Sequence, residues 1–271
     1  MLPTLPDVVQ EPIVKLALAE DLGVAGDATT DGLIGPEAQG RWALNARQAG
    51  AVAGLDAAML AGWSVDADMV FAIAAPDGAR VKAGETILEI EGAARSVLMA
   101  ERTMLNFIGR LSGVATLTRA FVDAIDGLDV IIASTRKTTP GLRALEKRAV
   151  RLGGGGAHRY GLDDAILIKD NHIAAAGGVA EAMRRARAAR SHLMCIEIEV
   201  DDLDQLEEAL PHAPNAVLLD NFSLPDLKAA VKLAKGKTLL EASGGVTLEN
   251  VRSVAETGVD VISVGALTHS A

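Results

Sequence analysis

Residues 194–221 read "MCIEIEVDDLDQLEEALPHAPNAVLLDN". Two apolar runs, "MCIEIEV" and "AVLLD", enclose an amphipathic segment at 203–210. Short apolar runs bounded by turn residues are typical of buried strands, whereas the segment between them has helical spacing. Strand, helix and strand in this order predict a parallel βα unit with the helix outside the sheet.

The same alternation extends over the chain from about residue 113. The other apolar runs are "DVIIAS", "AILI", "TLLEAS" and "VDVISVG", and the other amphipathic segments lie at 141–152, 177–190, 224–234 and 247–256. Six strands suit either a doubly wound sheet or a barrel. Almost every run ends in polar or glycine residues, and in a barrel all these ends meet at one rim. We therefore expect a barrel with one shared pocket.

The first 112 residues differ and predict a small α+β domain, so the expected domains are 1–112 and 113–271. A helix is expected over 8–22, ended by Gly23, followed by strands in "RWALNAR", "MVFAIAA" and "ETILEIEG". A second helix is expected over 94–111. Glu101 falls inside its apolar stripe and Arg102 at the border, where a charge costs stability unless it is paired.

Composition limits the function classes. Lys and Arg total 26 against 36 Asp and Glu, and this net charge of −10 argues against nucleic-acid and membrane binding. No apolar stretch reaches the roughly 18 residues of a membrane span. The start lacks the pattern of a signal peptide, and the single cysteine, Cys195, suits a reducing compartment. We expect a cytoplasmic protein.

One basic stretch stands out in this acidic chain. From Arg136 to Arg159 there are seven Lys or Arg and one acid, which indicates a site for a small anion. Arg136 and Lys137 have the strongest claim because they follow a strand. The helical stripe Arg143, Lys147 and Arg151 is either a solvated face or an extension of the positive field.

Two glycine-rich segments have different expected roles. "GGGG" at 153–156 follows a helix, so it is interpreted as a helix stop and turn. "SGG" at 243–245 follows a strand and precedes a helix that Thr247 is expected to cap, which is the order of a phosphate site. Ser263, Val264 and Gly265, after the next strand, are expected beside it.

Acidic residues occupy two neighbouring strands. Glu197 and Glu199 are two apart and therefore share one face, and Asp220 ends the following strand. Such carboxylates suit Mg²⁺ or ribose hydroxyls. Structural salt bridges with Lys169 and Arg159 are the alternative.

Several long motifs, in one order, resemble the quinolinate phosphoribosyltransferase family. They are "EDLGVAGDATTDGLI", "AERTMLNFIGRLSGVAT", "TRKTTPGLRALEKRAV", "GGGGAHRYGLDDAILIKDNH", "EIEVDDLDQLEEAL", "LLEASGGVTLENV" and "TGVDVISVGALTHS". The resemblance implies an N-terminal α/β sandwich followed by an incomplete, about seven-stranded α/β barrel. It also implies that quinolinate and phosphoribosyl pyrophosphate give nicotinate mononucleotide, pyrophosphate and CO₂, with Mg²⁺ required.

The resemblance also implies roles for individual residues. Catalytic roles fall to Lys137, Lys169, Glu199 and Asp220, with Glu199 and Asp220 as metal ligands. The quinolinate carboxylates would be surrounded by Arg102, Thr135, Arg136, Lys137, His158 and Arg159. The ribose and diphosphate would contact Lys169, Glu199 and Asp220, and the 5′-phosphate would contact Ser243, Gly244, Gly245, Ser263, Val264 and Gly265. Arg102 would enter the pocket of a neighbouring subunit, which implies a homodimer or a multiple of one.

Two positions depart from the family pattern, and three rival functions remain open. Ala157 replaces the usual Asn before the His-Arg pair, and Ser134 stands where Cys or Asp is common. A molybdenum-transport-associated family has the same fold but generally lacks the "IKDNH" motif. The second rival is a Schiff-base aldolase that uses Lys169, and the third is a dimeric binding protein without enzymatic activity.

Overall fold

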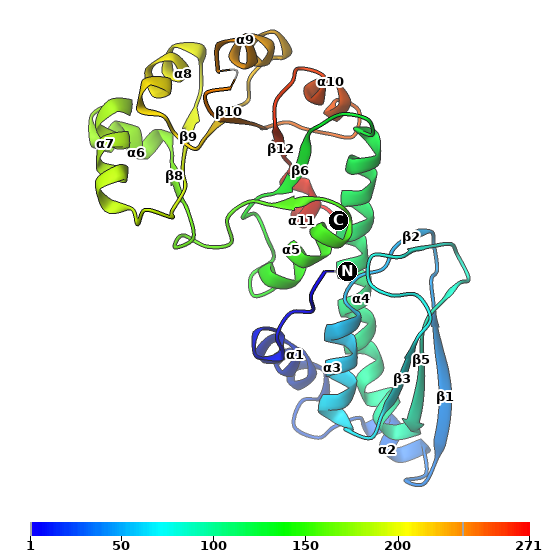
Figure 1. Ribbon diagram of the computed structural model, residues 1–271. Helices are drawn as coiled ribbons and strands as arrows, with labels where there is room; N and C mark the ends of the chain where they lie inside the picture. The colour runs from blue at the N-terminus through cyan, green and yellow to red at the C-terminus, as the bar shows by residue number, and fades with distance from the viewer. Residues whose placement is uncertain (1, 235) are drawn as a thin grey trace. The chain divides into compact units, whose positions relative to one another are not determined.

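The computed structural model describes residues 2–234 and 236–271, which form two compact units (Figure 1). Unit 1 consists of Met1–Arg119, Thr138–Gly154 and Thr268–Ala271, and unit 2 of Ala120–Lys137 and Gly155–Leu267. The helix α4 (Ala94–Ala124) contains the predicted domain boundary at residue 112. Each unit is described separately below.

Unit 1 contains an antiparallel sheet in the order β1-β5-β3. Its strands match the three predicted runs and are β1 (Gln39–Asn45), β3 (Val70–Ile73) and β5 (Thr86–Ala93). Two short strands, β2 (Gly50–Ala51) and β4 (Arg80–Val81), pair with each other in a separate antiparallel sheet. The helix α3 (Leu55–Val65) packs on this sheet, because Trp63 meets Phe71 edge-to-face at 5.3 Å. An α/β sandwich is therefore confirmed for this unit.

Three further helices of unit 1 bear on the sequence predictions. The first helix, α1 (Asp7–Leu22), ends before Gly23, as expected, and Gly23 has a positive φ of 56°. The helix α2 (Ala28–Leu33) begins after Asp27, whose carboxylate accepts the N–H groups of Thr29 and Thr30. The helix α4 continues 13 residues beyond the predicted end at 111, to residue 124. Glu101 and Arg102 are exposed, so the expectation that Glu101 lies in the buried stripe is wrong. No described helix is both long and apolar enough to cross a membrane.

The helix α5 (Arg143–Leu152) buries three consecutive charged residues. Glu146 accepts hydrogen bonds from Arg110 Nη2 at 2.8 Å and from the backbone N–H of Thr139 at 3.0 Å. Lys147 has no exposed surface. A solvated face is therefore the wrong interpretation for Lys147.

Arg148 is the third of these charges and bridges two acids. Its Nη2 lies 3.1 Å from Asp56 Oδ2 and its Nη1 lies 2.6 Å from Asp77 Oδ2. Burial raises the pKa of Asp56, and Arg148 opposes that rise. Asp77 also accepts the backbone N–H of Leu55 at the start of α3, so Arg148 connects α5 to α3.

Unit 2 is a seven-stranded parallel sheet in the order β7-β6-β12-β11-β10-β9-β8. Its strands are β6 (Ile131–Ser134), β7 (Gly156–Ala157), β8 (Ile166–Ile168), β9 (Ile196–Val200), β10 (Ala216–Asp220), β11 (Leu239–Ser243) and β12 (Val261–Ser263). The last strand in the chain, β12, pairs with the first strand of the unit, β6. That pairing brings the two ends of the chain segment together in the sheet, and the strand order stays open, with its two ends at β7 and β8. The expected incomplete barrel is confirmed, whereas a doubly wound sheet is excluded because the order never reverses.

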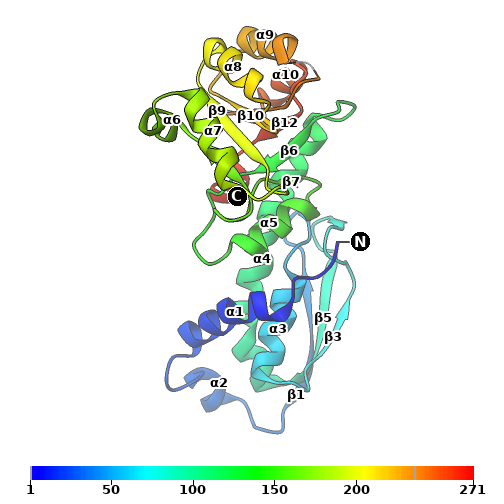
Figure 2. The same ribbon diagram turned by 60° about the vertical axis from the view of Figure 1, so that its left-hand side comes forward.

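Helices connect these strands on the outside. They are α6 (Asp170–Ala176), α7 (Val179–Ala189), α8 (Leu203–Ala209), α9 (Leu224–Ala234) and α10 (Val251–Ala255), with a 3₁₀ turn η1 (Leu210–His212) and a last helix α11 (Ala266–His269) in the chain. Both views show α8, α9 and α10 along the outer side of the strands (Figure 1, Figure 2). The strand side chains facing these helices are apolar, as in Ile196, Ile198 and Val200 of β9.

The opposite face of the strands carries the charges. Leu218 of β10 is in register with Glu199 of β9 and with Glu241 of β11, so these three side chains share one side of the sheet. Asp220, Ser243 and Ser263 form the next row on that side. Since the helices cover the other side, the charged face lines the barrel interior.

Candidate functional site

The predicted residues of unit 2 gather at the carboxyl ends of the barrel strands. Thr135, Arg136 and Lys137 follow β6, His158 and Arg159 follow β7, and Lys169 follows β8. Glu199 lies one residue before the end of β9, and Asp220, Ser243 and Ser263 are the last residues of their strands. Parallel strands put all these ends at one rim, as the sequence predicted. Arg102 belongs to unit 1 and is exposed on α4.

Two guanidinium groups form a cationic side of this rim. Burial lowers the pKa of Arg159 and the charge of Arg136 lowers it further, while Asp164 and Glu197 act in the opposite direction. Arg159 Nη1 donates to the carbonyl of Ala165 at 2.9 Å, and its Nε is buried without a hydrogen-bond partner among the described residues. A desolvated guanidinium beside a second one favours an anionic ligand, since the anion would relieve both the burial and the repulsion.

Lys169 and Glu199 form an ion pair at the same rim. Lys169 Nζ lies 2.5 Å from Glu199 Oε2, and the Glu199 side chain is 12% exposed against 47% for Lys169. This is one of the salt bridges that the sequence left open. The ion pair occupies the side-chain nitrogen that a Schiff-base aldolase would need as its nucleophile.

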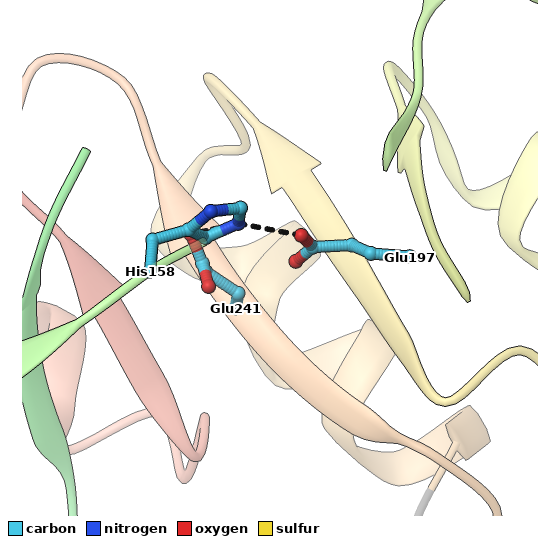
Figure 3. A group of neighbouring side chains, drawn as sticks. All are labelled: His158, Glu197 and Glu241. Atoms are coloured by element: carbon cyan, nitrogen blue, oxygen red, sulfur yellow. Dashed lines mark hydrogen bonds and ion pairs between the residues drawn. The ribbon is translucent and has the colours of Figure 1, made fainter. Parts of the chain in front are cut away.

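Deeper in the barrel, His158, Glu197 and Glu241 point toward one another (Figure 3). His158 Nε2 lies 2.6 Å from Glu197 Oε2 and 4.0 Å from Glu241 Oε1. The three residues come from non-adjacent strands, which places their meeting point inside the barrel. The sequence left open a salt bridge of Glu197 with Lys169 or Arg159; the ion pair found for Glu197 among the described residues is the one with His158. The sequence marked Glu241 only as a polar residue near a strand end.

The loop that was expected to bind phosphate contains its two glycines, but no helix begins directly after it. Gly244 and Gly245 are exposed after β11 with φ of 94° and 60°. The expectation that Thr247 caps the next helix is wrong: α10 begins only at Val251 and has five residues. The Asn250 side chain accepts the N–H of Thr247 and donates to the carbonyl of Gly245, which fixes a turn there instead. Any anion site here rests on the glycine loop and the serines.

Asn221 is a rim residue that the sequence patterns did not single out. It has a φ of 55°, in the left-handed region, and its backbone N–H donates to the carbonyl of Ser243 at 2.8 Å. Its amide Nδ2 donates to Asp220 Oδ2 at 2.8 Å. Asn221 thus connects the acid that ends β10 to the glycine loop after β11. The sequence signal was an Asn directly after the strand, since Asn tolerates this conformation better than most residues.

The structure also shows where the glycine-rich segment at 153–156 lies, and where the two residues lie that depart from the family pattern. Gly153 follows α5 and its N–H bonds back to Ala149, so the expected helix stop at 153–156 is confirmed. Ser134 is fully buried in β6, and Ala157 is exposed at the end of β7.

Comparison with known proteins decides the family. The model of the quinolinate phosphoribosyl transferase C-terminal domain matches residues 114–271, and that of the N-terminal domain matches 27–112. The chain belongs to the quinolinate phosphoribosyltransferase family.

Relatives in this family are similar over nearly the whole chain. A nicotinate-nucleotide pyrophosphorylase [carboxylating] of Mycobacterium leprae is 46% identical, over 95% of this chain and 92% of the relative. A quinolinate phosphoribosyltransferase [decarboxylating] of Nicotiana tabacum is 38% identical, over 99% and 81%. Among solved structures, NadC from Streptococcus pyogenes has a TM-score of 0.95 at 38% identity, covering 99% of this chain and 95% of that one. The family membership and the fold are thus supported by both comparisons.

The contact between Gly244 and Asn221 gives a prediction on stability. A Cβ at position 244 would lie 2.1 Å from Asn221 Oδ1 and 3.0 Å from its backbone nitrogen. We expect Gly244→Ala to lower the free energy of unfolding by at least about 1–3 kcal/mol, from backbone strain with the steric clash added. Urea unfolding measures the change. Gly245→Ala is the matched control, because φ is also positive there but no atom lies within 4 Å, so its loss should be smaller.

Proposed function

We propose that this protein transfers the phosphoribosyl group of phosphoribosyl pyrophosphate to quinolinate, releasing pyrophosphate and CO₂ and forming nicotinate mononucleotide in NAD biosynthesis. The observation that carries the proposal is the rim of the barrel, where Arg136 and Arg159 lie close enough to lower the pKa of Arg159 in a chain of net charge −10. Both substrates carry several negative charges. A cationic pocket in an acidic molecule suits them, and the family shown above fits that chemistry.

We assign different residues of the rim to each of the two substrates. We assign Arg136, Lys137 and Arg159 to the quinolinate carboxylates, with His158 beside them and Thr135 at the start of the loop. Lys169 is assigned to the diphosphate. Ser243, Gly244, Gly245, Ser263, Val264 and Gly265 are assigned to the 5′-phosphate.

The reaction follows from these positions. The bond between ribose C1 and the pyrophosphate oxygen breaks, the electron pair leaves with pyrophosphate, and positive charge develops at C1. We assign the carboxylates of Glu199 and Asp220 to the stabilisation of that charge, and Lys169 to the leaving group. The quinolinate nitrogen bonds to C1 and becomes cationic. The ring then loses its 2-carboxylate as CO₂, because the cationic nitrogen stabilises the electron pair left at C2, and C2 takes up a proton.

Mg²⁺ is part of the proposal, held by Glu199 and Asp220. These are hard oxygen donors from the adjacent strands β9 and β10. They do not belong to the group of three donor side chains, His158, Glu197 and Glu241, that the described residues bring within 4.8 Å of one another. Two carboxylates fit Mg²⁺, which usually keeps several waters and substrate phosphates as its other ligands. When bound, the ion would supply positive charge to the diphosphate.

Turnover is the decisive test. We expect the protein, incubated with quinolinate, phosphoribosyl pyrophosphate and Mg²⁺, to form nicotinate mononucleotide and one CO₂ per turnover, measured by chromatography and release of labelled CO₂. Use of nicotinate or nicotinamide in place of quinolinate would overturn the assignment. No turnover with any of them would favour the binding protein, and trapping of Lys169 by borohydride would favour the aldolase. The relatives named above give no support to a role in molybdenum transport.

We further propose a homodimer, or a multiple of one, in which Arg102 completes the pocket of the neighbouring subunit. Arg102 is exposed on α4, as such a role requires. We expect Arg102→Ala and Lys169→Met each to have little activity alone and to regain up to about a quarter of wild-type activity when mixed, since one of the two sites in each hybrid dimer is then intact. Activity assays after subunit exchange measure this. Complete exchange without recovery would contradict a shared site.

The cellular location is the last part of the proposal. Cys195 is the only cysteine of the sequence and is exposed. A free, exposed thiol suits the reducing cytoplasm that we propose.

A further inference from the structure

The hydrogen bonds of His158 define the state of its ring. The backbone N–H of Arg159 donates to His158 Nδ1 at 2.8 Å, so Nδ1 must present a lone pair. The other nitrogen, Nε2, lies 2.6 Å from Glu197 Oε2, and a carboxylate can only accept. Nε2 therefore carries the ring's single hydrogen and donates it to Glu197. This is a neutral imidazole in one tautomer.

The charges around the ring act in opposite directions, and the hydrogen-bond geometry decides between the neutral and the cationic ring. Glu197 of β9 and Glu241 of β11 face the ring and favour a cationic imidazolium. Arg159, the next residue, is a cation, as is Arg136, whose charge acts on Arg159, and cations oppose a further positive charge on the ring. A proton on Nδ1 would set two N–H donors against each other at 2.8 Å and deprive the amide of Arg159 of its acceptor. The hydrogen bond can exist only with the neutral ring.

The same hydrogen bonds count against a metal in this cluster. His158, Glu197 and Glu241 have donor atoms within 4.8 Å of one another, which resembles a metal site. A metal at Nε2 would need the lone pair of that nitrogen, but Nε2 holds the hydrogen because Nδ1 accepts one from Arg159. The arrangement of the three side chains therefore suits the hydrogen bond from His158 to Glu197 and not a metal ion.

The segment that begins with His158 contacts the Arg159 guanidinium at its other end. Residues 158–165 connect β7 to β8, the two ends of the sheet order. Asp164 accepts the N–H groups of Tyr160 and Gly161 at 2.6 and 3.1 Å, and the Ala165 carbonyl accepts from Arg159 Nη1. The guanidinium of Arg159 is thus fixed by Ala165 at one end, and its backbone by the ring of His158 at the other.

We propose that Glu197 is a positioning residue: by accepting Nε2–H it selects the neutral tautomer of His158, which holds the backbone of Arg159 and so aims its guanidinium at the anionic substrate. His158 thus acts through Arg159, with both ring nitrogens engaged inside the protein. This inference rests on the proposed function for the identity of the substrate. The tautomer itself does not depend on it.

Nitrogen NMR of the ring tests the proposal directly. In protein labelled with ¹⁵N-histidine, with the His158 resonances identified by their loss in His158→Gln, we expect two widely separated ring nitrogens at neutral pH, with Nδ1 the unprotonated one. Glu197→Gln keeps an acceptor oxygen and should preserve this pattern. Glu197→Met removes the acceptor, so the pattern should collapse toward exchange between tautomers or toward imidazolium. Glu241→Met is the matched control: it also removes a buried carboxylate, but one 4.0 Å from Nε2, and should preserve the pattern.

Kinetics then connect the tautomer to the substrate. Glu197→Met should raise the KM for quinolinate about 10- to 100-fold with a smaller change in kcat, and Glu197→Gln should recover most of that loss. Two equivalent, protonated ring nitrogens in the wild type, or an Nδ1–H tautomer, would overturn the proposal, as would an unchanged ring pattern in Glu197→Met. A wild type without quinolinate turnover but with the expected ring pattern would reject the proposed function and leave the positioning role intact.

Discussion

Replacing Lys169 with Met is expected to lower kcat/KM by about 10²–10³-fold while the protein stays folded. The change removes the ammonium group that lies 2.5 Å from Glu199 at the rim, and a preorganised donor at developing charge contributes about this much to catalysis. It also leaves the mostly buried Glu199 carboxylate without its cation in a pocket for anions. The Lys169 side chain is half exposed, so the fold does not depend on it.

Steady-state kinetics and circular dichroism of the same samples measure the two parts of this prediction. Lys228→Met is the matched control, because Lys228 is exposed on α9, one of the helices outside the barrel strands. It should keep wild-type kinetics. A Lys169→Met protein with wild-type kcat/KM would mean that this ion pair is structural, as the sequence alone allowed.

Replacing Arg148 with Met is expected to lower the free energy of unfolding by about 3–5 kcal/mol, since it leaves two largely buried carboxylates without a cation. The side chains of Asp56 and Asp77 are 21% and 12% exposed. Urea unfolding at about pH 8 measures the loss. Arg184→Met is the matched control, because it breaks an ion pair with Glu181 that is exposed to solvent, and exposed ion pairs contribute little to the free energy of unfolding.

The loss in Arg148→Met should also depend on pH. Burial already raises the pKa of Asp56, and without Arg148 that pKa should rise further. The folded variant then binds a proton more readily than the unfolded chain, so its stability falls as pH rises above the ordinary value of the carboxyl, 3.8. The destabilisation relative to wild type should therefore be smaller at about pH 5 than at about pH 8. Equal losses at both values would show that the variant lost packing and not charge compensation.

The barrel could be predicted from the sequence because its strands are apolar runs that end in polar, charged or glycine residues. The rows of Glu199, Asp220 and Ser243 follow from alternation along each strand. One strand was too short to give a pattern, because β7 has only two residues. His158 follows directly after β7, so its contact with Glu197 could not be expected from the sequence.

The remaining differences between sequence and structure arose where tertiary contacts decide between local conformations. A stripe of cations on a helix is typical of a solvated face until the surrounding chain is known, and Lys147 proves to be buried. Thr247 is a good helix cap by residue type, but Asn250 bonds to its N–H and delays the helix. Glu199 had two candidate roles in the sequence, and its distance from Lys169 required the fold.

The two ends of the sheet order have a consequence for the protein's behaviour in concentrated solution. An incomplete barrel presents unpaired backbone groups at β7 and β8, which in other sheets invite strand addition by a second chain. Here those strands have only two and three residues. Edges this short offer little template for cross-chain pairing, so the missing eighth strand leaves room for the segment of His158 and Arg159 without creating a centre for aggregation.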